Sequence, residues 1–168
     1  MRILVEPDGF VVFSHQRMRC ALGKGGIRID KCEGDGATPV GEFALGRVFY
    51  RPDRLSTPPS AELTIQPLTK NMGWCDDTRH PDYNCLITLP HPAHHEKMWR
   101  EDGLYDVVVE ILYNTDPPRA NIGSAIFIHV AKPNYAPTEG CIALKLDDLL
   151  KLLRMCTKTS FITIPAPS

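Results

Sequence analysis

Hydrophobic and polar positions alternate over short segments along most of the chain, as expected for β-strands with one buried face. Ile3–Val5 and Phe10–Phe13 flank Pro7-Asp8-Gly9, a turn sequence that predicts a β-hairpin. Tyr105–Tyr113 has the strongest strand pattern, because its centre is β-branched and too short for a typical helix. Further strands are predicted at Arg17–Leu22, from Phe43 to Tyr50, and at Leu63–Gln66, Leu86–Leu89, Ile126–Val130 and Ser160–Ile164.

One segment near the C-terminus has a helical pattern instead. Asp147 is a suitable N-cap, Asp148 suits the positive end of a helix dipole, and an apolar stripe of leucines follows. His94–Trp99 is predicted to form a turn or second short helix, and the proline-rich Arg51–Ser60 a surface loop. The pattern predicts a mostly β single domain over residues 1–168, with one or two short helices.

Composition narrows the functional classes. The chain has 168 residues, of which 43% are hydrophobic and 23% charged, so it is long enough for a substantial core. A net charge of −1 gives no electrostatic basis for binding nucleic acid or an anionic membrane. The N-terminus lacks the apolar run of a secretory signal, and no stretch reaches transmembrane length. We therefore expect a chain that is cytoplasmic as written, or one whose signal has been removed.

A histidine and a cysteine form the main candidate for chemistry. His129 ends a predicted strand, and Cys141 follows it by twelve positions, directly after Gly140. An imidazole beside a thiol lowers the thiol pKa and favours the reactive thiolate. Gly140 permits a sharp turn that aims nearby amide N–H groups at a developing oxyanion. The alternative is a buried structural thiol and a core histidine, which is the commoner fate of both residue types.

The sequence offers two other candidate sites, one for a phosphate-containing cofactor and one for zinc. The glycines between Gly23 and Gly36 resemble a phosphate-binding loop superficially, but no Gly-Lys-Ser/Thr sequence follows them. A zinc site would have to be drawn from residues whose spacing matches no compact ligand pattern. Those residues are Cys75, His80, Cys85, His91, His94 and His95. We therefore expect neither a metal nor an organic cofactor.

Two separated motifs resemble those of one enzyme family. Thr38-Pro39-x-Gly41-x-Phe43 resembles the TPxGxF element of YkuD-type L,D-transpeptidases. His129 with Thr138-x-Gly140-Cys141-Ile142 resembles their catalytic signature, and the resemblance extends from about Ile3 to Leu153. It implies a β-sandwich or barrel-like fold, a place in the cell envelope or periplasm, and action on peptidoglycan stem peptides without a cofactor.

The resemblance also implies roles for the motif residues. Cys141 would be the nucleophile, His129 the base, and the Val130 carbonyl the group that orients the imidazole, while the N–H groups of Gly140 and Cys141 would form the oxyanion hole. The thiolate would attack the L-centre carbonyl of a diamino acid and form a thioester. An acceptor amine would then give a cross-link, whereas water would make the chain an L,D-carboxypeptidase or amidase. Carbapenem-type compounds are expected to acylate such a thiol. A wall-binding module with an inactive site is the non-enzymatic alternative.

The chain departs from the family pattern around the cysteine. Val130 stands where the family usually has glycine, Glu139 where it often has histidine, and Ala143 where an arginine is usual. Loss of that arginine removes a partner for a substrate carboxylate, and we expect Arg100 to replace it. The other predicted substrate-binding residues are Trp99, His95, Tyr83, Asn84, Thr138 and Glu139. The alternative is that Asn71–Asp106, which contains most of these residues, forms solvated loops whose tryptophans, Trp74 and Trp99, cap the core.

Overall fold

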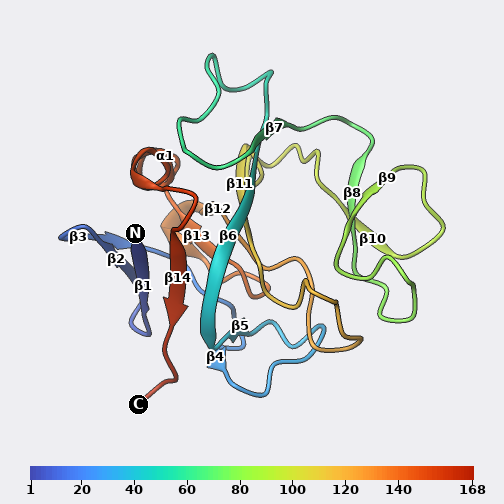
Figure 1. Ribbon diagram of the computed structural model, residues 1–168, viewed down its shortest axis with the longest axis horizontal. Helices are drawn as coiled ribbons and strands as arrows, with labels where there is room; N and C mark the ends of the chain where they lie inside the picture. The colour runs from blue at the N-terminus through green and yellow to red at the C-terminus, as the bar shows by residue number, and fades with distance from the viewer.

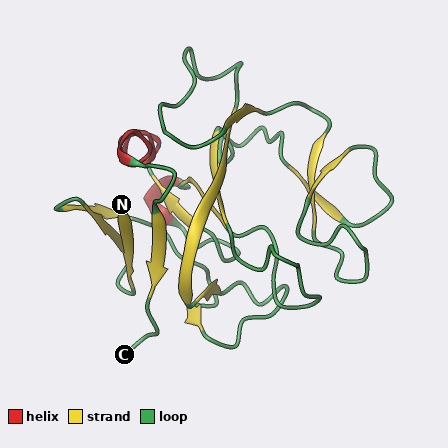
Figure 2. Cartoon of the chain, in the orientation of Figure 1, coloured by secondary structure: helices red, strands yellow, loops and turns green.

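A nine-stranded mixed sheet forms the centre of the fold in the computed structural model, which describes residues 1–168. Its strand order is β13-β12-β11-β6-β14-β1-β2-β3, with β7 paired to β6 (Figure 1). The strands are β1 (Arg2–Glu6), β2 (Phe10–Phe13), β3 (Gln16–Arg19), β6 (Gly41–Tyr50), β7 (Ile65–Pro67), β11 (Val107–Ile111), β12 (Phe127–Val130), β13 (Ile142–Leu144) and β14 (Phe161–Ile164). The predicted mostly β fold is confirmed, and Figure 2 shows how little of the chain is helical.

Two small sheets complete the fold. One contains β8 (Met72–Cys75), β9 (Leu86–Thr88) and β10 (His95–Lys97) in the order β10-β8-β9, and it lies beside the main sheet (Figure 1). The other pairs β4 (Ile27–Arg28) with β5 (Thr38–Pro39). The first small sheet was only partly predicted, because Gly73 interrupts the apolar pattern of β8.

Strands β11 and β12 are buried on both faces and separate two apolar clusters. Val107 and Val109 of β11 pack into the larger cluster, together with leucines of helix α1 (Leu146–Met155). Val108 and Phe127 belong to the second cluster, with Trp74 of β8. Because side chains alternate along a strand, His129 of β12 shares the face of Phe127. The two faces of β12 therefore differ in function: one completes the main core and the other supports the site.

Two predictions of local structure are corrected. Helix α1 begins at Leu146, its N-cap position is Lys145, and no side chain caps it. Asp147 therefore lies inside the first turn, where its charge favours the positive end of the helix dipole. His94–Trp99 is not helical, since His95–Lys97 pairs as strand β10 with β8. No helix of the chain has the length and apolar composition needed to cross a membrane.

Candidate active site

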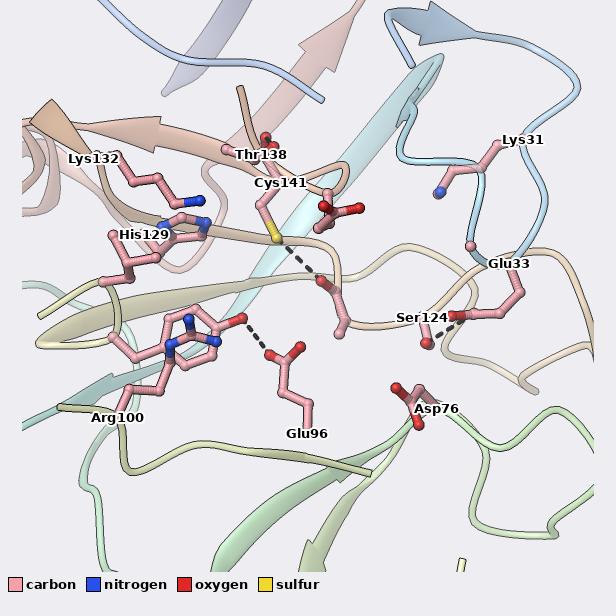
Figure 3. A pocket seen from close by; sticks show the side chains of 15 residues that line it. Lys31, Glu33, Asp76, Glu96, Arg100, Ser124, His129, Lys132, Thr138 and Cys141 are labelled. Carbon is pink, nitrogen blue, oxygen red and sulfur yellow. Dashed lines mark hydrogen bonds between the residues drawn. The ribbon is translucent and has the colours of Figure 1, made fainter. Parts of the chain in front are cut away.

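Parallel pairing of β12 and β13 brings the histidine and the cysteine together. His129 is in register with Ala143, and Cys141 directly precedes β13. The chain between them contains the short 3₁₀ helix η1 (Pro133–Tyr135). Both side chains line one cavity of about 280 Å³, and Figure 3 shows them pointing into it. The pairing of β12 with β13 therefore brings the predicted pair, His129 and Cys141, close together in space.

The ring of His129 is held as a neutral imidazole. His129 is 6% exposed, and its Nδ1 lies 2.8 Å from the carbonyl oxygen of Val130. Because a carbonyl only accepts, Nδ1 carries the proton and Nε2 keeps a free lone pair. Burial lowers the His129 pKa to about 4. The side chain is therefore uncharged at neutral pH and able to accept a proton at Nε2.

Cys141 rests as a thiol. Its Sγ donates to the carbonyl oxygen of Ala125 at 3.2 Å and accepts from the N–H of Phe127 at 3.4 Å. Burial raises the Cys141 pKa to about 12. Desolvation therefore favours the neutral thiol, in contrast to the expectation that the imidazole holds the sulfur as thiolate. The site therefore holds a neutral thiol beside a neutral imidazole.

Two buried threonines fix the turn that carries Cys141. The hydroxyl of Thr138 donates to the Cys141 carbonyl oxygen at 2.6 Å and accepts from the Gly140 N–H at 3.1 Å. The hydroxyl of Thr38 donates to the Gly140 carbonyl oxygen and accepts from the Gly23 N–H, both at 2.9 Å. The Gly140 N–H, expected in the oxyanion hole, is thus already used, whereas the Cys141 N–H has no hydrogen-bond partner.

Gly140 is required at this turn for a steric reason. Its φ is +132°, and a Cβ there would lie 2.7 Å from the carbonyl oxygen of Ala37. Residues with a side chain rarely adopt this backbone conformation. The glycine of the cysteine motif therefore lets the turn pack closely against the segment that leads into β5.

Side chains of both charge signs line the cavity. Arg100 and Lys132 lie near His129, Glu96 lies on the same side as Arg100, and Glu33, Asp76 and Lys31 lie across the opening (Figure 3). The Arg100 guanidinium donates to Asp102, with Nε 3.0 Å from Oδ1, and lies 5.0 Å from the centre of the Tyr105 ring. The cavity thus offers charged groups for both a carboxylate and a cation.

The predicted substrate-binding residues divide into two groups. Arg100, Thr138 and Glu139 line the cavity, and Glu139 also pairs with Lys24 at 2.8 Å. Trp99, His95, Tyr83 and Asn84 do not line it. The structure therefore does not bring these four residues into the cavity of the nucleophile, and their role in substrate binding stays a prediction.

Each of those four residues has another role in the structure. Trp99 packs under the buried guanidinium of Arg51, whose Cζ lies 3.7 Å from the ring centre. Tyr83 and Asn84 are 3% and 5% exposed. The Asn84 side chain accepts from Trp74 Nε1 at 2.9 Å and from the Ala125 N–H at 3.0 Å. His95 is a β10 residue that lines a different surface pocket. The alternative interpretation, in which the tryptophans belong to the core, is correct for Trp74, which is 2% exposed.

Several cavity residues were not predicted. They are Lys31, Glu33, Asp76, Glu96, Leu104, Tyr105, Ser124 and Lys132. Lys31 and Glu33 belong to the glycine-rich stretch that superficially resembles a phosphate loop. In the structure this stretch forms a wall of the site. Asp76, Glu96 and Tyr105 lie within Asn71–Asp106, the region predicted to supply a substrate wall. Their burial next to a nucleophile is the signal that sequence could not supply.

Two of the six residues considered as zinc ligands, His80 and His91, lie close together in the structure. His80, Asp82 and His91 have donor atoms within 4.8 Å of one another, while the cysteines considered do not join them. Nδ1 of His80 accepts from the Asp82 N–H, and Nδ1 of His91 accepts from the Ala93 N–H. Each ring therefore carries its proton on Nε2, where a metal would have to bind. Hydrogen bonds account for this cluster.

Comparison with known proteins identifies the family. The family profile of the L,D-transpeptidase catalytic domain, YkuD, matches residues 2–164. No curated protein matches the chain. Two crystal structures are similar: the helical cell shape determining protein Pgp2 from Campylobacter jejuni, with 15% identity and a TM-score of 0.46, and its K307A mutant, with 14% identity and a TM-score of 0.45. This chain is covered to 99% in both, but it spans only about half of theirs, 48% and 47%. With a profile match over nearly its whole length, the chain belongs to the L,D-transpeptidase catalytic domain (YkuD) family.

Proposed function

We propose that this chain is a cysteine acyltransferase that forms L,D-cross-links between peptidoglycan stem peptides. The observation that carries the proposal is the shared cavity of Cys141 and His129, in which Nε2 is free to take a proton and the Cys141 N–H is free to bind an oxyanion. A nucleophile, an oriented base and an oxyanion donor are the parts that acyl transfer requires.

The first half-reaction forms a thioester. As Sγ of Cys141 attacks the carbonyl of the diamino acid's L-centre, its proton moves to Nε2 of His129. The resulting imidazolium is stabilised through Nδ1–H by the carbonyl of Val130. The oxyanion accepts from the Cys141 N–H. Nε2 then returns the proton to the leaving amine, the C–N bond breaks, and the terminal D-residue departs.

The second half-reaction transfers the acyl group. An amine of a second stem attacks the thioester, gives its proton to Nε2 of His129, and releases Sγ, which is reprotonated by the imidazolium. Water in place of the amine makes the same site an L,D-carboxypeptidase. Arg100 is the proposed clamp for the carboxylate of the departing residue, because its guanidinium lines the cavity on the His129 side.

Mass spectrometry of products from tetrapeptide-stem muropeptides tests the proposal. Wild type is expected to form dimers, with fragmentation locating the new bond, and Cys141→Ala is expected to form none. Cys85→Ala, which removes a cysteine outside the cavity, is the matched control and should retain activity. Trimmed monomers without dimers would identify a hydrolase. Unchanged muropeptides with wild type would contradict both reactions and favour the inactive wall-binding module.

A further inference from the structure

Glu96 presents a carboxylate to the cavity without a basic partner. It lies on β10 and is half-buried; its Oε1 accepts from the Tyr105 hydroxyl, and it forms no ion pair. Its Oε2 has no hydrogen bond, yet no fully buried side-chain oxygen of the chain lacks a partner. Oε2 therefore reaches the open space of the cavity, as Figure 3 indicates.

Tyr105 fixes this carboxylate relative to the catalytic pair. Tyr105 is 5% exposed, and its ring packs edge-on against the His129 ring, with centroids 5.4 Å apart. It also packs against Phe127, which precedes His129 on β12, at 6.0 Å. The position of Glu96 is thus coupled through one rigid aromatic side chain to the residues that would perform the chemistry.

The surroundings of Glu96 favour a cation at this wall. Glu33, which accepts from Tyr83 and Ser124 through Oε2, also has no basic partner. The ammonium of Lys31 is already paired with Asp35 at 2.9 Å. Burial raises the pKa of Glu96, whereas the Tyr105 hydroxyl and the charge of Arg100 lower it, so a further positive group beside it would stabilise the carboxylate.

The spacing of the acidic side chains distinguishes the kind of cation. His80, Asp82 and His91 have ligand atoms within 4.8 Å of one another. The carboxylate oxygens of Glu33, Asp76 and Glu96 do not form such a group. A divalent metal needs several oxygens converging on one point, whereas an organic ammonium is bound well by one fixed carboxylate.

We infer that Glu96 is a specificity-determining residue that binds an ammonium group of the substrate. The inference rests on the proposed function: a stem peptide acylated through one centre of a diamino acid carries its second amino group as an ammonium at neutral pH. Glu96 would bind that group while Arg100 holds the carboxylate of the departing residue. Stems whose second amino group is blocked are then poor donors.

Binding in an inactive background tests this directly. We would measure by calorimetry the affinity of Cys141→Ala for a stem tetrapeptide with a free second amino group, and for the same peptide acetylated on that group. A preference for the free amine on the order of 10- to 100-fold is expected for a charge-assisted contact. Adding Glu96→Gln should abolish the preference, while Tyr105→Phe should reduce it. Exposed Glu62→Gln, outside the cavity, should leave it intact.

Glu96→Gln keeps the size of the side chain and an oxygen that can accept from Tyr105, so the fold is expected to persist, which circular dichroism would verify. Equal affinity of Cys141→Ala for the two peptides, failure to bind either, or a preference that survives Glu96→Gln would each overturn the inference. Turnover of the free-amine peptide by wild type is measured separately. A binding preference without turnover would contradict the proposed function and leave this inference standing, whereas turnover without the preference would do the reverse.

Discussion

The hydroxyl of Thr38 donates a 2.9 Å hydrogen bond to the carbonyl oxygen of Gly140, across 102 positions of sequence. The same hydroxyl accepts the N–H of Gly23, and Thr38 is fully buried. One side chain therefore ties the TPxGxF element and the glycine-rich segment to the turn before Cys141. This relationship explains why a motif without chemistry of its own accompanies the cysteine motif.

Replacing Thr38 with valine keeps the shape and removes the hydroxyl. The Gly23 N–H and the Gly140 carbonyl would both lose a buried partner, so we expect a loss of about 2–4 kcal/mol in the free energy of unfolding. Urea denaturation measures it. Thr159→Val, at an exposed position, is the control and should change stability little. Wild-type stability in Thr38→Val would show that the contact is dispensable.

Gly140→Ala is expected to be costly for a different reason. The new Cβ would lie 2.7 Å from the Ala37 carbonyl at a backbone angle that alanine rarely adopts, which predicts a loss of about 3 kcal/mol or more. Gly26→Ala is a matched control, because Gly26 also has a positive φ, +75°, but its Cβ would meet nothing within 4 Å. It should cost about 1 kcal/mol. Equal losses in the two variants would refute the steric argument.

His129 should make stability depend on pH. Its folded pKa of about 4 lies below the ordinary value of 6.5, so the unfolded chain binds the proton more readily between these values. The free energy of unfolding is therefore highest above about pH 6.5 and falls by about 3 kcal/mol as the pH decreases to 4. Urea unfolding of wild type and His129→Gln from pH 4 to 8 measures the difference. Parallel curves for the two proteins would show that the imidazole does not titrate as described.

Alkylation should report the resting state of Cys141. Because its pKa is raised to about 12, modification of Cys141 by iodoacetamide should be slow at pH 7 and rise about tenfold per pH unit up to pH 10. Peptide-resolved mass spectrometry separates Cys141 from the five other free cysteines, with exposed Cys32 as the internal reference for access. A rate that levels off near neutral pH would instead reveal that Cys141 is a thiolate.

The local signals of the fold were readable because each element satisfies its own pattern. The Pro7-Asp8-Gly9 turn identified the β1–β2 hairpin, β-branched residues identified β11, and period-two alternation placed Phe127 and His129 on one face of β12. His94–Trp99 misled because β10 owes its structure to pairing with β8, a tertiary effect that overrides a weak local preference. Element boundaries failed for the same reason at α1, whose start is set by the end of β13 rather than by a capping side chain.

The sequence predicted site residues correctly only where they lie within a motif. Cys141, His129 and Thr138 share a short stretch of sequence, whereas the cavity walls come from segments far apart in the chain. Tyr83 and Asn84 were predicted to bind substrate, yet both are buried, and the Asn84 side chain accepts hydrogen bonds from Trp74 and from the Ala125 N–H. Whether a polar side chain faces substrate or supports its neighbours depends on burial, which pattern alone does not determine for loops.

The position of β14 has a consequence for how the sheet assembles. Phe161–Ile164 lies between β1 and β6, parallel to the first strand of the chain and antiparallel to the longest one. During synthesis the sheet stays split until these late residues leave the ribosome, and the early strands wait with one edge unpaired. The threonine contacts that shape the cysteine turn involve only residues that precede β14 in the chain. The turn can therefore form before the sheet is complete, whereas the centre of the sheet closes only when the last strand of the domain pairs with β1 and β6.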